Sequence, residues 1–268
     1  MQDGIRYQVD QLKTSSAFTF ARSLFHAAEG EELFKHRMYF ASAVSVYYSF
    51  FHLGVALILA YWSQPPSQDE HHTRLRKALE KWKKIQSPLP SEVPDPGEDV
   101  GHQDVRSFLT LEIPEFLKTL DAAKQMREFV SYGPRVRSDG NKSIVYSGCQ
   151  YTAEDFSRCL KQNLNAYTHC LRSAVRWLKE KGHDEIRGRV LSASFILFEF
   201  NELRSYHPEP VVNRAWAVYR SLCEHEGLDW REYNPDPLAF STDEDRRRER
   251  YANLVRFLLM GSSAKPPD

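Results

Sequence analysis

The sequence lacks several features that would place it in a familiar functional class. Its 36 Lys and Arg residues balance 36 Asp and Glu residues, so the net charge of zero gives no overall attraction to nucleic acid or membranes. The four cysteines include no Cys-x-x-Cys pair, which argues against a zinc site and favours free thiols in a reducing compartment. No signal-peptide pattern opens the chain, and no standard phosphate-loop, zinc-protease or serine-hydrolase motif occurs. We therefore expect a cytoplasmic protein without a metal or other cofactor.

Charge is also missing from one long internal stretch. The 25 residues Met38–Trp62 contain no Lys, Arg, Asp or Glu, which is long enough for a membrane-spanning helix. The first half of this stretch, however, holds hydroxyl groups and an imidazole that lipid would leave without water: Ser42, Ser45, Tyr47, Tyr48, Ser49 and His52. These residues favour the central helix of a helical bundle, surrounded by other helices. A membrane-anchored protein is the alternative, which detergent partitioning would reveal.

Apolar periodicity predicts an all-α fold. Helices are expected at about residues 16–34, 37–63, 71–85, 113–132, 152–181, 183–206, 211–226 and 243–260. A proline-rich surface loop is expected over 87–101, a polar loop with a possible short strand at Ser143–Tyr146 over 135–148, a turn region over 230–242, and a disordered tail over 261–268. We predict a bundle at about residues 1–182 and a helical C-terminal extension at 183–268 that packs on it.

The uncharged helix carries a recognisable signature. A run of small residues from Ala41 leads into Tyr47-Tyr48, Phe51 and His52. A His-bearing segment follows at 71–75, and a later helix ends with Arg127, four residues and Tyr132 before a last long helix. This order resembles that of the HEPN domains, small helical domains named for nucleotide binding in higher eukaryotes and prokaryotes. The resemblance covers about residues 16–182 and implies a HEPN-like up-and-down helical bundle.

The resemblance also implies an action on RNA. Active HEPN members are mostly metal-independent ribonucleases with an Arg-x4-6-His motif, often working as homodimers, and many are toxins or defence effectors. Arg127 would contact phosphate, while Tyr132 takes the place of the nuclease His. A phenol is a poor base at neutral pH, so Tyr132 would orient the substrate or stack on it. The protein would then be either an active ribonuclease or a relative that binds RNA without cutting it. Arg135, Arg137 and Lys142 form a candidate RNA-binding loop beside this catalytic pair.

A second function class stays open. The Arg-x4-Tyr version resembles the HEPN subgroup whose genes often sit beside small nucleotidyltransferases, which makes Tyr132 a candidate target of nucleotidylation. The protein would then be a non-catalytic interaction module that docks a partner protein, such as a nucleotidyltransferase antitoxin. Side chains of Arg127 and Tyr132 in an open basic cleft would favour RNA, and side chains sealed in the bundle would favour the module.

Two further Arg–His spacings match the nuclease motif by number alone. Arg220 and His225 form a literal Arg-x4-His, and Arg176 and His183 form an Arg-x6-His. Because the chain holds 10 His and many Arg residues, chance matches are expected. The first pair also lies in the extension, five residues apart on a helix, where the two side chains do not share one face. Neither pair is our preferred site.

Structural roles compete with the functional ones. Tyr47, Tyr48 and His52 are expected to pack in the core with their polar atoms hydrogen-bonded. Arg127 has two nearby acids, Glu128 and Asp121, with which it would form an ordinary surface ion pair.

Overall fold

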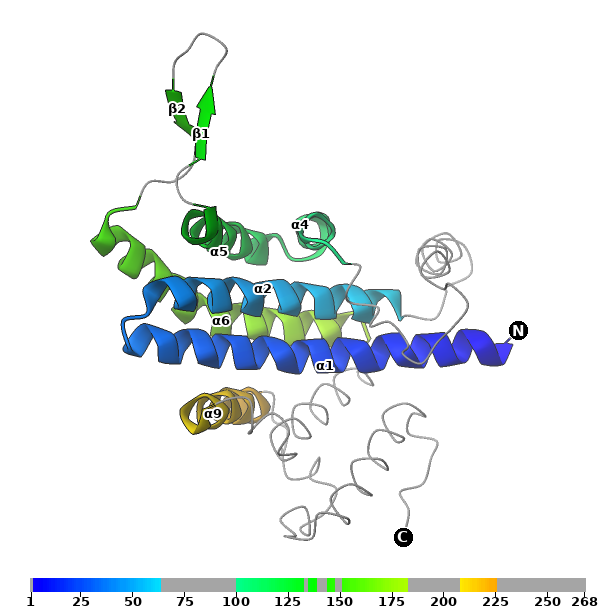
Figure 1. The fold of residues 1–268 in the computed structure, drawn as a ribbon. Coiled ribbons are helices and arrows are strands. Elements are labelled where there is room, and N and C mark those ends of the chain that lie inside the picture. The colour runs from blue at the N-terminus through cyan, green and yellow to red at the C-terminus, as the bar shows by residue number, and fades with distance from the viewer. Residues whose placement is uncertain are drawn as a thin grey trace, which may run out of the picture.

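A computed structural model of the chain describes residues 2–63, 100–132, 135–138, 144–147, 151–182 and 208–225 (Figure 1). The helices are α1 (Gln2–Lys35), α2 (Tyr39–Trp62), α4 (His102–Glu112), α5 (Pro114–Tyr132), α6 (Ala153–Glu180) and α9 (Glu209–His225). Two short strands, β1 (Arg135–Ser138) and β2 (Ile144–Ser147), lie between α5 and α6. Apart from this strand pair, the described ranges are helices and the short segments that join them, which confirms the predicted all-α fold. The predictions for 71–85, 183–206, 230–242, 243–260, the tail and nearly all of loop 87–101 lie outside the described residues.

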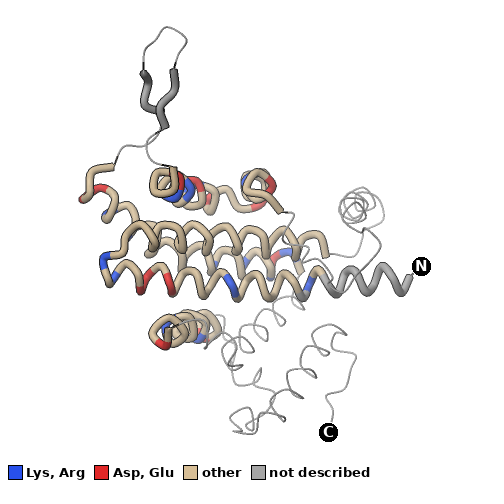
Figure 2. The backbone as a smooth tube through the Cα atoms, in the orientation of Figure 1, with Lys and Arg blue, Asp and Glu red and all other residues tan. Residues whose placement is uncertain are grey.

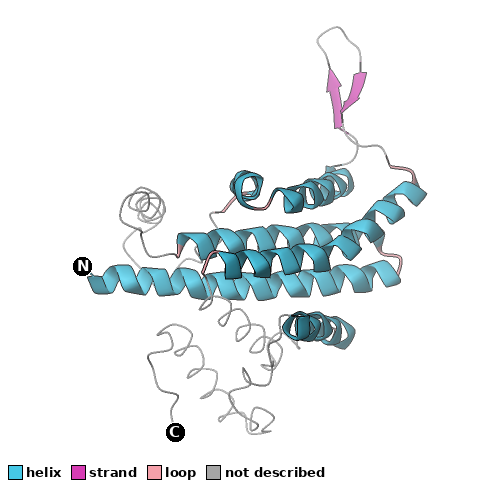
Figure 3. Cartoon of the chain, turned by 180° about the vertical axis from the view of Figure 1, so that it is seen from behind, coloured by secondary structure: helices cyan, strands magenta, loops and turns pink. Residues whose placement is uncertain are grey.

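The helices are arranged around an antiparallel pair. Helices α1 and α2 run side by side, with α6 along them (Figures 1 and 3). Helices α4 and α5 cover one side of α2, and α9 lies against α1 on the opposite side of the bundle. Helix α1 begins at Gln2, well before the predicted start near Ser16. The described residues of 2–182 thus form one helical bundle around α2.

Helix α2 is the interior helix that its composition predicts. Figure 2 shows it without a single charged residue among neighbours that carry many. Among the described helices, α2 is the one that is long and apolar enough to cross a membrane, yet 78% of its most apolar window is buried inside the molecule. Phe50, Leu53 and Leu59 are fully buried. Such burial is what a core helix requires, because the surrounding helices already cover its apolar surface.

The serines of α2 make its burial possible. Ser42 donates a hydrogen bond from Oγ to the carbonyl oxygen of Gly30 on α1 at 2.6 Å, and Ser49 donates to the carbonyl oxygen of Val46 at 2.7 Å. Both hydroxyls are buried, and each bond offsets the cost of removing it from water. At Gly30, an added Cβ would lie 2.8 Å from a methyl carbon of Val46, so glycine allows the two helices to approach closely here.

Helix α4 is not among the predicted helices. The carboxylate of Asp104 accepts a hydrogen bond from the backbone N–H of Gly101 at 2.9 Å, which stabilises the start of the helix. Val105 and Leu109, one turn apart, bury its inner face completely. Val105 packs so closely on α2 that a Cβ on Gly54 would lie 2.3 Å from it. The short apolar stripe of α4 is the sequence signal that could have predicted this helix.

The boundaries of α5 and α6 agree with the sequence signals. Pro114 occupies the first position of α5, where its missing N–H costs nothing. Thr152 caps α6 by accepting a hydrogen bond from the backbone N–H of Asp155 at 3.1 Å. Gly182 follows the helix with a positive φ of 72°, as a C-terminal glycine often does.

The predicted polar loop between α5 and α6 is wrong in part. Residues Arg135–Ser138 pair antiparallel with Ile144–Ser147, so this region contains a small β-hairpin. The possible strand at Ser143–Tyr146 is therefore shifted by one residue, and its partner strand was not predicted. Val136, Val145 and Tyr146 are strand-forming residues that favour this pairing over an irregular loop.

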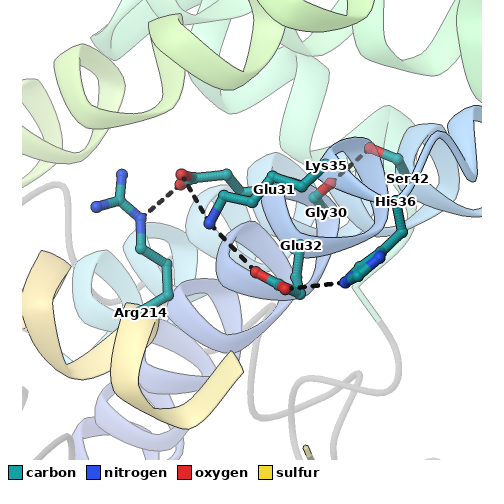
Figure 4. A network of polar contacts seen from close by, with 7 residues as sticks. All are labelled: Gly30, Glu31, Glu32, Lys35, His36, Ser42 and Arg214. Atoms are coloured by element: carbon teal, nitrogen blue, oxygen red, sulfur yellow. Dashed lines mark hydrogen bonds and ion pairs between the residues drawn. The ribbon is translucent and has the colours of Figure 1, made fainter. Parts of the chain in front are cut away.

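Helix α9, from the predicted extension, is joined to α1 by an ion pair. The Arg214 Nε lies 2.5 Å from a carboxylate oxygen of Glu31 (Figure 4). Lys35 bridges Glu31 and Glu32, at 3.7 and 3.2 Å from their oxygens, and His36 lies 3.2 Å from Glu32. Apolar packing of Val211, Ala215, Tyr219 and Leu222 completes the contact surface of α9.

Candidate functional site

The two candidate catalytic residues lie together near the end of α5. Met126 turns into the core and is buried, so Arg127, the next residue, lies half-buried at the flank of the helix. Tyr132 is the last residue of α5 and is 61% exposed. The Arg127 guanidinium carbon lies 5.6 Å from the centre of the Tyr132 ring, within the range of a cation–π interaction. The pair is therefore at the surface and is not sealed inside the bundle.

Tyr47 of α2 is a third member of this site. The Arg127 guanidinium carbon lies 5.4 Å from the centre of the Tyr47 ring, so the cation is in contact with two phenol rings. Tyr47 is buried, and burial raises the pKa of its hydroxyl, although the positive charge of Arg127 opposes the shift. The expected core position of Tyr47 is confirmed, but its contact with Arg127 was not predicted.

His102 joins the site from α4. Its Nδ1 lies 3.3 Å from the Tyr47 hydroxyl, within hydrogen-bond distance. Burial, reinforced by the positive charge of Lys124, lowers the pKa of His102, so the imidazole is neutral at neutral pH. Its Nε2 is buried and has no hydrogen-bond partner among the residues that the structure describes. Sequence spacing could not reveal this contact, because His102 and Tyr47 are 55 residues apart.

The acids near Arg127 are engaged elsewhere. Asp121 accepts hydrogen bonds from Arg106, with a closest separation of 3.2 Å, and a carboxylate oxygen of Glu128 lies 3.8 Å from the Lys124 ammonium. Arg127 forms no ion pair with any residue in the described ranges. The alternative in which Arg127 pairs with Asp121 or Glu128 is therefore not what the structure shows. Its charge instead lies against two aromatic rings.

The remaining candidate residues are placed only in part. Arg135 and Arg137 lie on β1, two positions apart on the strand that follows α5. Lys142 lies outside the described residues. The competing pair Arg220 and His225 lies exposed on α9, across the bundle from α5 (Figure 1).

The other Arg–His match lies only partly within the described residues. Arg176 is exposed on α6, whereas His183 lies outside the described residues. Among the residues that are described, no group of three or more His, Cys, Asp or Glu is arranged to hold a metal ion.

A second aromatic cluster lies on the neighbouring face of α2. The rings of His26 and His52 stack with centres 5.1 Å apart, and Tyr48 lies 5.9 Å from His52. Burial and the neighbouring His26 and Arg22 lower the pKa of His52 to about 3. Tyr48 and His52 are half-buried, and Tyr48 packs against the core, so the prediction that both lie in the core is confirmed only in part. Being adjacent to Tyr47 in sequence does not place Tyr48 in the same environment, because successive helix positions are rotated by about 100°.

Comparison with known proteins adds no relative. No protein-family model matches the chain, and no curated protein or solved structure matches it either.

Proposed function

We propose that the protein is HEPN-like and acts on RNA, with Arg127 as its phosphate contact. One observation carries the proposal: the half-buried Arg127 guanidinium contacts the rings of Tyr47 and Tyr132, while both nearby acids are engaged with other cations. A guanidinium that is not neutralised by a carboxylate keeps its charge and hydrogen-bond donors for a phosphate. The β1 arginines, Arg135 and Arg137, follow directly in sequence and would add positive charge.

The arrangement supports binding of RNA better than cleavage. Cleavage requires a base near the 2′-hydroxyl of the substrate, and the Tyr132 phenol is a poor base at neutral pH. The His102 imidazole is neutral, but its Nδ1 faces the Tyr47 hydroxyl and its Nε2 is buried. If the protein does cut RNA, the resemblance implies a reaction without metal, a homodimer and a role as a cytoplasmic toxin or defence effector.

The test compares two arginines of the same bundle. Arg127→Ala removes the proposed phosphate contact, whereas Arg106→Ala removes an arginine already paired with Asp121. Binding of a mixed RNA pool is measured by fluorescence anisotropy over a range of salt, and cleavage is followed with EDTA present. We expect Arg127→Ala to weaken binding and to lower the slope of log affinity against log salt by about 1. Arg106→Ala should leave both unchanged.

Three results would contradict the proposal. The first is a wild-type protein that neither binds nor cuts RNA. The second is binding that falls equally in Arg127→Ala and Arg106→Ala, which would reflect overall charge alone. The third is cleavage lost only in His225→Ala, which would move the site to α9.

The exposed position of Tyr132 also supports a second function. A nucleotidyltransferase partner could reach a tyrosine that is 61% exposed at a helix end. In that case, protein isolated from its native cells should carry a nucleotide mass on the peptide that contains Tyr132, and Tyr132→Phe should abolish it. Unmodified Tyr132, together with unchanged RNA binding in Tyr132→Phe, would remove this residue from both functions.

A further inference from the structure

The turn between α1 and α2 presents large apolar side chains to solvent. Met38 is 55% exposed and Phe40 is 58% exposed, immediately after the basic residues Lys35, His36 and Arg37. Arg37 adopts a positive φ of 61°, an uncommon conformation for a residue other than glycine. Isolated exposed apolar residues are common, but two of them beside a basic turn form a surface that is both apolar and basic.

A chain of packed rings leads from this turn toward Tyr132. The Phe40 ring meets Phe156 of α6 edge-on at 5.6 Å, and Phe156 lies 5.9 Å from Phe129 of α5. Phe129 also packs on Tyr151 at 5.4 Å. Tyr132 follows Phe129 by three residues, so the two share one side of α5. The exposed Phe40 thus lies at one end of a row of half-buried and buried rings, and the exposed Tyr132 lies about one helical turn beyond Phe129.

The row has an arginine near each end and an exposed acid, Glu154, on the first turn of α6 beside Phe156. Glu31 and Glu32 are the acids closest to the turn in sequence, and both are engaged by Lys35, His36 or Arg214 (Figure 4). Arg37 is exposed and forms no ion pair with any residue in the described part of the chain. At the other end of the row, Arg127 is also without a carboxylate partner among the described residues.

We propose that this end of the bundle binds unpaired bases of single-stranded RNA. The rings of Phe40 and Tyr132 provide stacking surfaces, and Arg37 and Arg127 contact the phosphates between the bases. Unpaired bases can leave their own stack for an aromatic side chain, whereas bases inside a duplex have both faces covered. The inference rests on the proposed function and specifies its substrate as single-stranded.

The experiment separates stacking from charge and from apolar contact. Anisotropy is measured with labelled single-stranded RNA of about 12 nucleotides, and with a duplex of equal length. Phe40→Leu keeps the apolar character but removes the aromatic face, Phe40→Trp keeps an aromatic face, and Leu111→Ala changes an 83% exposed apolar residue on α4. We expect Phe40→Leu to weaken single-strand binding about 10-fold. Phe40→Trp, Leu111→Ala and all duplex affinities should change by less than about 2-fold.

The possible failures are distinguishable. No RNA binding by the wild type would overturn both the inference and the proposed function. If RNA binding weakens in Arg127→Ala but not in Phe40→Leu, the result agrees with the proposed function but rejects the stacking surface. Equal binding of single strand and duplex would also reject it. If Phe40→Leu instead changes only the oligomeric state, measured by light scattering, the surface is a protein interface and the inference is wrong.

Discussion

The two faces of α2 use aromatic residues in different ways. On the core face, the fully buried Phe50 packs against Phe116 at 5.9 Å and Tyr167 at 5.7 Å. The one polar atom of this group, the Tyr167 hydroxyl, is hydrogen-bonded to Ser23 at 2.6 Å. Burial raises the pKa of Tyr167, so this phenol stays neutral. This face is closed, and each of its groups has a partner within the bundle.

The surface of α2 around Tyr47, which we call the open face, also meets α5 and is built from the same residue types, but it is polar and partly open. Tyr47, three residues before Phe50, contacts the imidazole of His102 and the guanidinium of Arg127. Tyr48, whose ring centre lies 5.2 Å from that of Tyr47, is half-buried. The difference shows that a helix without charged residues can still provide polar side chains for a site. Its rings pack in the core at Phe50 and contact a cation near the surface at Tyr47.

The largest expected effect tests the closed face. Phe50→Ala should destabilise the protein by about 3–5 kcal/mol, because it removes buried contacts and leaves a cavity between α2, α5 and α6. Phe51→Ala is the matched control, since Phe51 is the next residue and is half-buried. Chemical denaturation followed by circular dichroism measures both free energies of unfolding. Equal losses for the two variants would mean that the faces do not differ in packing.

Much of the closed face could be predicted from the sequence. The absence of charge from residues 38–62 indicated an interior helix, and Pro114 and Thr152 marked the starts of α5 and α6. These signals are local, because a cap, a proline or an apolar stripe acts within one or two turns of helix. Helix α4 was missed because its short apolar stripe follows a proline-rich stretch, which obscured its start.

The open face could be predicted only in part. Arg127 and Tyr132 were placed near each other by their spacing on one helix, and the structure shows them in contact. The contacts of Tyr47 with His102 and Arg127 join residues far apart in the chain, and periodicity gives the face of a helix but not its neighbour. The resemblance to HEPN domains predicted the role of Arg127, and that role stays a prediction until RNA binding is measured.

The second prediction uses pH to examine the cluster of His26, Tyr48 and His52, which adjoins the open face. His52 has its pKa lowered to about 3 by burial, compared with an ordinary value of 6.5. Between these values the unfolded chain binds the proton and the folded chain does not, so stability falls as the pH is lowered from about 6.5. At about 1.4 kcal/mol per pKa unit, the loss by pH 4 is at most about 3.5 kcal/mol. His52→Phe should remove this part of the pH dependence.

The comparison of His52→Phe with wild type isolates this residue from other titrating groups. The difference between their free energies of unfolding, measured by urea denaturation from pH 4 to pH 8, should change with pH only below about pH 6.5. His26, which stacks on His52, is present in both proteins. A difference that is constant over the whole range would show that the folded protein protonates His52 as easily as the unfolded chain does.

The smallest expected effect tests the polar link that distinguishes the open face. Tyr47→Phe removes the hydroxyl that lies 3.3 Å from His102 Nδ1 and should cost about 1 kcal/mol of stability. Tyr48→Phe is the matched control, because Tyr48 forms no hydrogen bond through its hydroxyl within the described ranges and should change stability by less than about 0.5 kcal/mol. Since the Tyr47 hydroxyl holds His102 in place, NMR titration should also show a changed pKa of that imidazole in Tyr47→Phe alone. If Tyr47→Phe and Tyr48→Phe change stability and the His102 pKa equally, the two phenols contribute only through their rings. The two faces of α2 would then differ only in how exposed their side chains are.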